Sequence, residues 1–311
     1  MPSASKILTR IGTRGSPLAL AQARMVQAML AAAHGVPKEA VEICIIKTTG
    51  DAIQDRPLAE VGGKGLFTKE IEQALLDNEI DLAVHSSKDM VTVLPPGLVL
   101  AACLEREDAR DVFVSSKAKS ITELPIGATM GSASLRRQAQ VKLLRPDINI
   151  VPLRGNVGTR LQKISEGVAD ATILALAGLK RLGLAEHATA ILDPKDFLPA
   201  VGQGAIGIEI RENDAKTRAC VDAINHDATL TAVTAERAFL AVLDGSCKTP
   251  IAGHATLDGD VLSFRGLIAK PDGSAFFEAS RRGSAKDPAK LGIEAGNELK
   301  QRAGADFFAE H

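Results

Sequence analysis

Apolar residues in the first part of the chain follow two different periods. Short runs rich in β-branched residues predict strands at residues 6–12, 41–47 and 81–85. Elsewhere apolar residues recur three or four positions apart, as in Leu18, Ala21 and Met25, which predicts a helix that begins after Ser16. A second helix is expected over residues 68–78. This alternation favours βαβ units with a parallel or mixed sheet.

The same alternation resumes near Asp111. Predicted strands cover residues 112–114, 126–131, 150–153 and 171–174. Predicted helices cover residues 134–144, 157–166 and 176–182. Residues 206–210 form one more strand that the pattern assigns to no sheet. Turns from strand to helix are where α/β sheets gather ligand-binding groups, so we examine the polar residues at these turns first.

The last part of the chain has a different pattern. One helix over residues 229–243 is followed by strands at 254–257, 261–268 and 275–280. Asp258-Gly259 and Pro271-Asp272-Gly273 separate the strands and are typical turn sequences. A helix over residues 288–303 follows. The pattern predicts a small α+β domain with a three-stranded antiparallel sheet.

Composition narrows the classes of function. Lys and Arg total 37 against 38 Asp and Glu, so no global basic field attracts nucleic acid or an anionic membrane. Nine Phe with no Trp or Tyr provide little stacking surface for single-stranded nucleic acid. The N-terminus lacks a signal-peptide pattern and no apolar stretch reaches transmembrane length, so we expect a cytoplasmic protein. The four cysteines form no CxxC pair, and no metal site is expected.

Basic residues stand where strands lead into helices or in a glycine-rich loop: Arg14, Lys64, Arg136, Arg137, Arg154 and Arg160. A cation at a helix N-terminus opposes the helix dipole, and an anionic ligand bound there would offset this cost. For any single arginine, a solvated surface position is the better interpretation. The set as a whole predicts a ligand with several carboxylates or phosphates, without deciding between them.

The segment His85-Ser86-Ser87-Lys88-Asp89 directly follows an apolar strand. Strand ends are favoured catalytic positions in α/β sheets, although an ordinary surface turn fits the position equally well. His85 is either a general base or a hydrogen-bonded structural histidine. Position alone leaves both readings open.

Cys247 differs from the other cysteines. Cys44, Cys103 and Cys220 lie among apolar neighbours and are expected in the core. Cys247 follows Asp244-Gly245-Ser246 and precedes a lysine, a setting that lowers a thiol pKa and exposes the sulfur. We interpret Cys247 as the candidate reactive thiol.

Taken together, these segments resemble the porphobilinogen deaminase family in colinear order over nearly the whole chain. Ser246 departs from the pattern, since the family has a second glycine there. The matching segments are residues 13–20, 61–67, 85–89, 131–137, 153–160, 177–183, 198–204 and 245–247.

The resemblance implies an α/β fold with three domains. Two are lobes like those of type II periplasmic binding proteins, with mixed doubly wound sheets and a cleft between them. The third is the small C-terminal α+β domain with its three-stranded antiparallel sheet and the cysteine loop. The implied boundaries are residues 1–104 with 199–222, then 105–198, then 223–311.

The resemblance also implies an activity. Four porphobilinogen molecules are condensed head to tail with loss of ammonia, on a dipyrromethane cofactor thioether-linked to Cys247, and hydroxymethylbilane is released for tetrapyrrole synthesis. Positive charge develops on pyrrole nitrogens, and a fixed carboxylate stabilises it.

Roles are carried over by position. Asp89 is the expected catalytic carboxylate. The expected cofactor-binding residues are Cys247, Lys88, Ser86, Ser134, Arg136, Arg137 and Arg154. The expected substrate-binding residues are Arg14, Ser16, Lys64, Arg160 and Arg181. The family further implies a monomer with porphobilinogen as its small-molecule partner, and no nucleic acid or membrane.

Two other classes of protein could contain a similar α/β pattern. One is a non-catalytic module of periplasmic-binding-protein type that captures an organic anion, but such a module needs no third domain with an exposed thiol. The other is a LysR-type effector domain, although no helix-turn-helix segment is evident. The transferase is therefore our preferred hypothesis.

Overall fold

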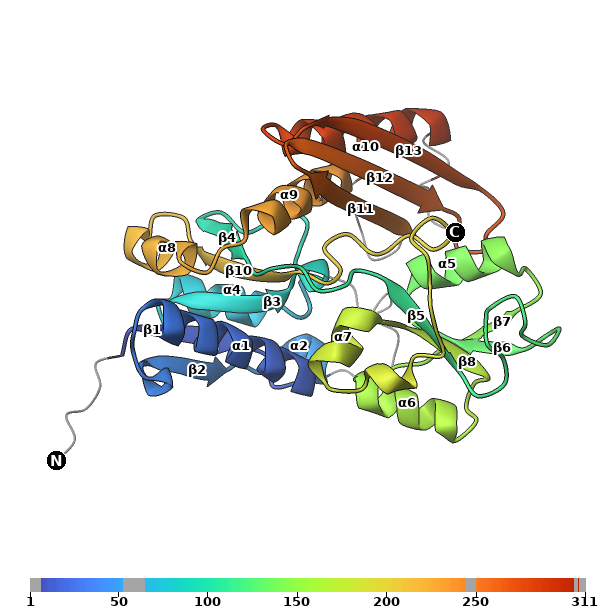
Figure 1. The fold of residues 1–311 in the computed structure, drawn as a ribbon, viewed down its shortest axis with the longest axis horizontal. Helices are drawn as coiled ribbons and strands as arrows, with labels where there is room; N and C mark the ends of the chain where they lie inside the picture. The colour runs from blue at the N-terminus through green and yellow to red at the C-terminus, as the bar shows by residue number, and fades with distance from the viewer. Residues whose placement is uncertain (1–6, 53–64, 244–249, 305–306, 308–311) are drawn as a thin grey trace. The chain divides into compact units, whose positions relative to one another are not determined.

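The computed structural model describes residues 7–52, 65–243, 250–304 and 307. The chain divides into two compact units (Figure 1). The first unit holds residues 1–107 and 205–230, and the second holds residues 108–204 and 231–311. This division does not test the three-domain boundaries, which remain a prediction. Among the described residues, no helix is both long enough and apolar enough to cross a membrane.

The first unit is built on a mixed five-stranded sheet. In spatial order, its strands are β2 (Val41–Ile45), β1 (Thr9–Thr13), β3 (Leu82–Ser86), β10 (Ile206–Arg211) and β4 (Leu98–Cys103). β1 is parallel to β2 and β3, whereas β10 is antiparallel to β3 and β4. The strand over residues 206–210, which the sequence pattern left without a sheet, therefore lies between β3 and β4.

Local sequence explains the long helix α1 (Pro17–Ala33) of this unit. The Ser16 hydroxyl accepts a hydrogen bond from the Ala19 amide, and Pro17 occupies the first helical position, as predicted. The buried face differs from the apolar spacing noted above: Val26 and Leu30 are buried, whereas Met25 is 42% exposed. Because many small alanines share this helix, apolar spacing alone does not identify its core face.

Short helices complete the first unit. They are α2 (Thr49–Ala52), α4 (Lys69–Leu76), α8 (Ala215–Asp222) and the 3-10 turns η1 (Lys38–Ala40) and η2 (Ser87–Asp89). Two apolar clusters, which include Ile11, Leu82 and Ile208 in one and Ile71 and Ile80 in the other, form its core.

The second unit contains another mixed five-stranded sheet. Its order is β7 (Asn149–Val151), β6 (Thr129–Gly131), β8 (Ala171–Ala175), β5 (Asp111–Ser115) and β9 (Ala190–Ile191). β6 is parallel to β7 and β8, and β5 is antiparallel to β8 and β9. The helices that belong with it are α5 (Leu135–Leu144), α6 (Val157–Ser165), α7 (Leu176–Arg181) and the 3-10 turn η3 (Ala185–His187).

The third sheet, also in the second unit, is the predicted antiparallel meander. Its strands are β11 (Ile251–Asp258), β12 (Val261–Ala269) and β13 (Phe276–Ser284). The helices α9 (Asp227–Val242) and α10 (Pro288–Ala303) share an apolar cluster with these strands. In its core, the ring centroids of Phe239 of α9 and Phe264 of β12 lie 4.9 Å apart, with the rings tilted by 56°. A smaller apolar cluster with Ala139 of α5 and Leu267 of β12 joins this sheet to the preceding one.

Most predicted elements are confirmed, and several points need correction. The expected strand over residues 126–131 is shorter, because Ile126 is 92% exposed and Gly127 takes a positive φ of 74°, so that β6 begins at Thr129. The sequence pattern missed β4, β9, α2 and α8 altogether. β4 is a short apolar run after Pro95-Pro96-Gly97, where the pattern has no clear period.

Asp170 holds together the entry to two strands of the second unit. Its carboxylate accepts hydrogen bonds from the amide of Thr129 at 2.7 Å and from the hydroxyl of Thr129 at 2.9 Å, and it pairs with Lys117. These partners, Lys117 first, lower the pKa of the carboxyl from 3.8 to about 2. A depressed pKa means that the ionised form is favoured by folding.

We expect Asp170→Asn to lower the free energy of unfolding by about 1–3 kcal/mol at neutral pH, because bonds to an ionised acceptor are lost. The stabilisation by Asp170 is present above the ordinary carboxyl pKa of about 4 and is lost as pH falls through about 2. Thermal melts of both proteins should therefore differ at pH 7 and converge toward pH 2. The exposed Asp222→Asn serves as the control. An offset that does not change with pH would contradict this account.

Candidate functional site

The candidate residues of the first unit gather at one edge of its sheet. β1 and β3 are parallel, so their carboxyl ends meet at the same edge. Arg14 follows β1 by one residue, and the segment from His85 to Asp89 ends β3 and forms η2. Residues about 70 positions apart in the sequence are thereby brought together.

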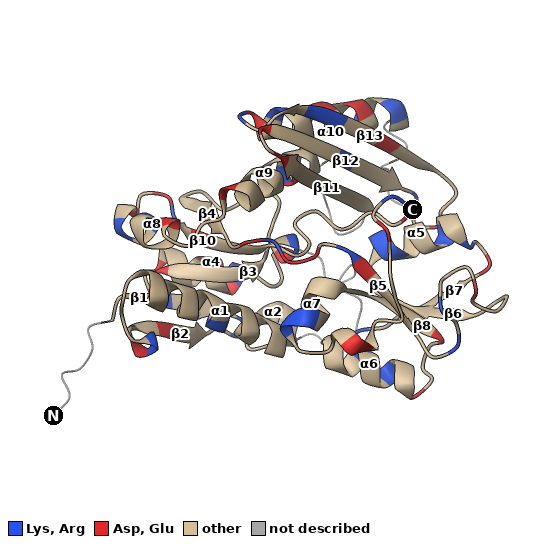
Figure 2. Cartoon of the chain, viewed as in Figure 1, with Lys and Arg blue, Asp and Glu red and all other residues tan. Residues whose placement is uncertain are grey.

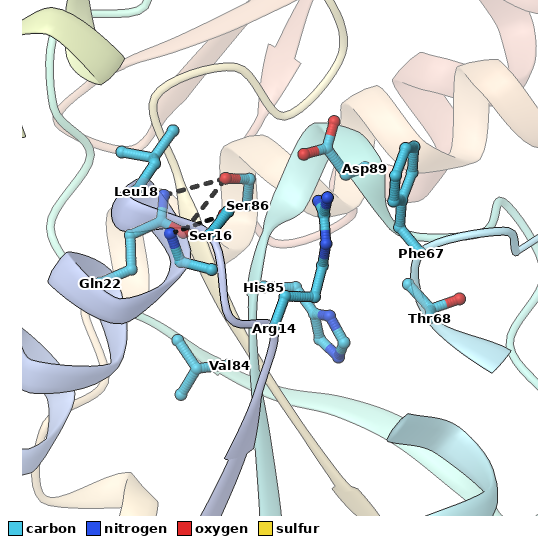
Figure 3. A pocket seen from close by; sticks show the side chains of 11 residues that line it. Arg14, Ser16, Leu18, Gln22, Phe67, Thr68, Val84, His85, Ser86 and Asp89 are labelled. Carbon is cyan, nitrogen blue, oxygen red and sulfur yellow. Dashed lines mark hydrogen bonds between the residues drawn. The ribbon is translucent and has the colours of Figure 1, made fainter. Parts of the chain in front are cut away.

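A small cavity of about 50 Å³ lies at this edge (Figure 3). The described residues that line it include four of the predicted site residues: Arg14, Ser16, Ser86 and Asp89. His85 lines it as well. Asp89 is exposed, whereas His85 is only 5% exposed. The four predicted residues thus bring a cation, a carboxylate and two serine hydroxyl groups into one small space.

Arg14 is oriented by an aromatic ring. Its guanidinium carbon lies 4.0 Å from the centroid of the Phe67 ring. Figure 3 shows this guanidinium pointing past the ring toward the side of the cavity that carries Asp89. A guanidinium stacked on a ring keeps its N–H groups in the plane, where they can meet a planar carboxylate with two parallel hydrogen bonds. This geometry suits Arg14 to an anionic ligand.

Ser86 is fixed by the first helix. The amide nitrogen of Gln22 lies 2.9 Å from the Ser86 hydroxyl, and that hydroxyl lies 3.2 Å from the Gln22 amide oxygen. Gln22 itself is 1% exposed and lines the cavity. Gln22 was not among the sequence candidates, because a polar residue in an apolar helix carries no signal of its own.

The second unit gathers its candidates in the same way. The carboxyl ends of the parallel strands β7, β6 and β8 meet at one edge, and the antiparallel β5 begins there. Ser134 caps α5 by accepting a hydrogen bond from the Arg137 amide at 3.5 Å. Arg154, Arg136 and Arg137 follow the ends of β7 and β6.

Arg136 and Arg137 share a carboxylate that the sequence candidates did not include. Nη2 of Arg136 lies 2.8 Å from Oδ2 of Asp111, and Nη2 of Arg137 lies 2.8 Å from Oδ1. Both arginines are 7% exposed and Asp111 is fully buried. Burial lowers the pKa of the Arg136 guanidinium, and the charge of Asp111 opposes this change. The negative charge of Asp111 therefore offsets part of the positive charge that the two arginines place at the start of α5.

The other candidate arginines of the second unit, Arg154, Arg160 and Arg181, are half-buried, and the last two donate hydrogen bonds to backbone oxygens. Nε of Arg160 donates to the Gly155 carbonyl at 2.9 Å, and Nη2 of Arg181 donates to the Gly204 carbonyl at 2.7 Å. Arg154 precedes α6, whose N-cap is Asn156. Each anchor holds a guanidinium in one direction.

Other candidates have different surroundings. Lys88 on η2 is exposed and does not line the cavity. Lys64 and Cys247 lie outside the described residues. Cys103 and Cys220 are buried, as expected for core thiols, while Cys44 is half-buried. Burial raises the pKa of the Cys44 and Cys220 thiols.

Charged residues of both signs are spread over the helices and loops of each unit (Figure 2). The cations that could bind an anionic ligand are therefore individual residues at defined places, such as Arg14 at the cavity and the arginine pair beside Asp111.

The fold and cavity define an α/β protein with two mixed five-stranded sheets and a small antiparallel sheet, and with a polar pocket suited to a small anionic molecule. Two family models match the chain. The model for the dipyrromethane cofactor binding domain of porphobilinogen deaminase matches residues 9–219, and the model for the C-terminal domain of that enzyme matches residues 230–301.

Curated relatives agree with these models. The porphobilinogen deaminase of Nitrobacter winogradskyi is 61% identical over 302 residues, which cover 97% of this chain and 96% of the relative. The enzyme of Nitrobacter hamburgensis is 58% identical with the same coverage. The chain belongs to the porphobilinogen deaminase family.

Solved structures give weaker likenesses. The methionine binding protein MetQ is 14% identical with a TM-score of 0.45, covering 76% of this chain and 95% of that chain. A putative methionine-binding lipoprotein of Bacillus subtilis is 13% identical with a TM-score of 0.43, covering 71% and 91%. The family match does not favour the non-catalytic binding module that the sequence left open.

Proposed function

We propose that this chain joins four porphobilinogen molecules head to tail, with loss of ammonia, and releases hydroxymethylbilane from a dipyrromethane held through Cys247. The chain is a transferase of the hydroxymethylbilane synthase type, and its N-terminal segment matches a dipyrromethane cofactor binding domain. The observation that carries the assignment of residues is the cavity that combines Arg14, Ser16, Ser86 and Asp89.

The described residues fit a ligand that carries several carboxylates. Arg136, Arg137 and Asp111 together bring two positive charges and one negative charge to a nearly buried position. A further carboxylate would balance that surplus, and guanidinium groups bind carboxylates in a planar, two-bonded arrangement. We assign Arg136, Arg137 and Arg154, with Ser134, Ser86 and Lys88, to the cofactor. When bound, the dipyrromethane supplies the primer to which pyrrole units are added.

Substrate binding is assigned to Arg14, Ser16, Lys64, Arg160 and Arg181. Porphobilinogen has an acetate and a propionate group, so each added ring brings two negative charges. A protein with net charge −1 must meet them with locally placed cations. Stacking on Phe67 at 4.0 Å and the backbone anchors of Arg160 and Arg181 supply such fixed positions.

Asp89 is assigned to the chemistry. Loss of ammonia from the aminomethyl group leaves positive charge on the pyrrole nitrogen, and carbon–carbon bond formation places it on the second ring. An exposed carboxylate at a strand end can stand beside both N–H groups and stabilise that charge. Its place on η2, directly after β3, holds the short side chain rigidly.

We further propose a cytoplasmic monomer without a nucleic-acid or membrane partner. The near-zero net charge and the lack of Trp and Tyr support the absence of a nucleic-acid or anionic-membrane partner. Porphobilinogen is the proposed small-molecule partner.

Cys247→Ser tests cofactor attachment. Intact-mass measurement of the unaltered protein should exceed the sequence mass by one dipyrromethane, and the variant should lose that excess because a serine hydroxyl does not form the thioether. Cys44→Ser, at a half-buried thiol, should keep the excess. Excess mass that survives in Cys247→Ser, or that maps to Cys44, Cys103 or Cys220, refutes the assignment.

The arginine assignments are tested one residue at a time. Arg136→Leu or Arg137→Leu should reduce cofactor content, measured as the fraction of protein with the added mass, because the positive surplus beside Asp111 disappears. Arg14→Leu and Arg160→Leu should load normally and lose substrate binding or elongation. Arg282→Leu, at an exposed position of β13, is the control. Full loading and normal turnover in all four variants would contradict the assignments.

Asp89→Asn keeps the side-chain shape and removes its charge. We expect turnover by cofactor-loaded protein to fall by about 10² or more, because one preorganised charge is lost from the site. Asp89→Glu retains the charge slightly displaced and should keep part of the activity. Porphobilinogen consumption per loaded molecule is the measurement, with Asp77→Asn as the control. Wild-type turnover in Asp89→Asn would remove Asp89 from the chemistry and leave His85 or a substrate carboxylate as the candidate.

A further inference from the structure

Three ionisable side chains are buried at the cavity of the first unit: one of them, His85, forms part of its wall, and the other two are not among the residues that line it. They are His85 on β3, Glu209 on β10 and Glu72 on α4, with exposures of 5%, 0% and 6%. Nε2 of His85 lies 3.2 Å from Oε2 of Glu209. In the antiparallel register, Gly207 faces His85 and Glu209 faces Ala83, so His85 and Glu209 are diagonal neighbours on one face of the sheet.

Such burial is costly, which calls for a reason. Neither carboxylate oxygen of Glu209 has a hydrogen-bond partner among the described residues, and the ion-pair contact with His85 is its close polar neighbour. An apolar side chain at this position of an otherwise apolar strand would avoid the desolvation cost. Burial raises the pKa of the Glu72 carboxyl, and the charge of Glu209 adds to this rise. Buried polar groups of this kind are often retained at functional sites.

The pair connects directly to the segment that carries Asp89. His85 and Ser86 are the last two residues of β3, and their side chains point to opposite faces of the sheet (Figure 3). Glu209 contacts the first, and Gln22 holds the second through hydrogen bonds. The end of β3 is therefore fixed from both faces, and η2 with Asp89 follows without a linker.

Packing beneath η2 supports this connection. A Cβ built on Gly207, which faces His85, would lie 3.0 Å from the sulfur of Met90 and 3.8 Å from the Cβ of Ser87. The Ser87 amide also donates to the Ala205 carbonyl at 3.0 Å. β10 thus lies directly against the turn, and a shift of β3 relative to β10 moves Asp89 with it.

We propose that Glu209, through its contact with His85, is a positioning residue that fixes the end of β3 and so the direction of the Asp89 carboxylate. The inference rests on the proposed role of Asp89. Glu209 lies behind the wall and does not line the cavity, so it acts through His85 and the strand rather than on substrate.

Glu209→Gln in cofactor-loaded enzyme tests the proposal. It keeps the side-chain size and replaces the carboxyl group that contacts His85 with an amide. We expect kcat to fall about tenfold with little change in KM, because a displaced catalytic group affects the reacting geometry more than binding. In the Asp89→Asn background, the same substitution should cost less than about twofold, since the residue through which it acts is already disabled.

Glu236→Gln is the matched control. Glu236 is also fully buried, belongs to the second unit and accepts hydrogen bonds from the amides of Gly202 and Ala255. Its loss should lower the melting temperature and leave kcat per loaded molecule unchanged. A purely structural role of Glu209 would give the same result as this control, and that result overturns the proposal.

A second pair of variants applies if Glu209→Gln does not fold. His85→Gln keeps an N–H donor for Glu209 and should retain most of kcat, whereas His85→Leu removes the donor and should lose about tenfold. Equal kcat in the two His85 variants refutes the proposal. The proposal is also refuted if Glu209→Gln lowers kcat by the same factor in the wild-type enzyme and in Asp89→Asn. Normal turnover by Asp89→Asn refutes the proposed role of Asp89 in the reaction. If Asp89→Asn is impaired and Glu209→Gln is not, the role of Asp89 stands and only the positioning role of Glu209 is refuted.

Discussion

Parallel pairing of a few strands is the constraint on which the site depends. In the first unit β1 and β3 run parallel, and in the second unit β6 runs parallel to β7 and β8. Residues that follow these strands must meet at one edge of each sheet, whatever their distance in the sequence. The cavity with Arg14 and Asp89 and the cluster around Asp111 both arise in this way.

Both edges also contain ionisable groups that are buried beside ionisable partners. Arg136 and Arg137 share Asp111, and His85 contacts Glu209. Since an isolated buried charge is very unfavourable, each such group has its partner within the fold. The cost of ordering these side chains is met when the chain folds. A ligand that binds to them meets groups already held in place, which is the physical meaning of preorganisation.

The sequence predicts the elements better than it predicts the partners of the charges. Strand and helix periods identify most of both large sheets and nearly all of the third, where the helix over 288–303 agrees with α10. The cavity residues Arg14, Ser86 and Asp89 could be proposed because each follows an apolar strand. Asp111 and Glu209 could not, because a single carboxylate at a strand start or within an apolar strand shows no period. The only available signal for Glu209 is its presence inside Ile-Gly-Ile-Glu-Ile.

Long-range pairing explains the remaining differences. β10 is readable as a strand from its apolar run, but its place between β3 and β4 depends on a chain return of more than 100 residues that no local pattern encodes. That return brings Glu209 to His85 and Ala205 to Ser87. A near-neutral chain can therefore place several charged groups at one site without an unusual composition. The fold, and not the number of charged residues, determines which opposite charges lie together and which cation lines a cavity.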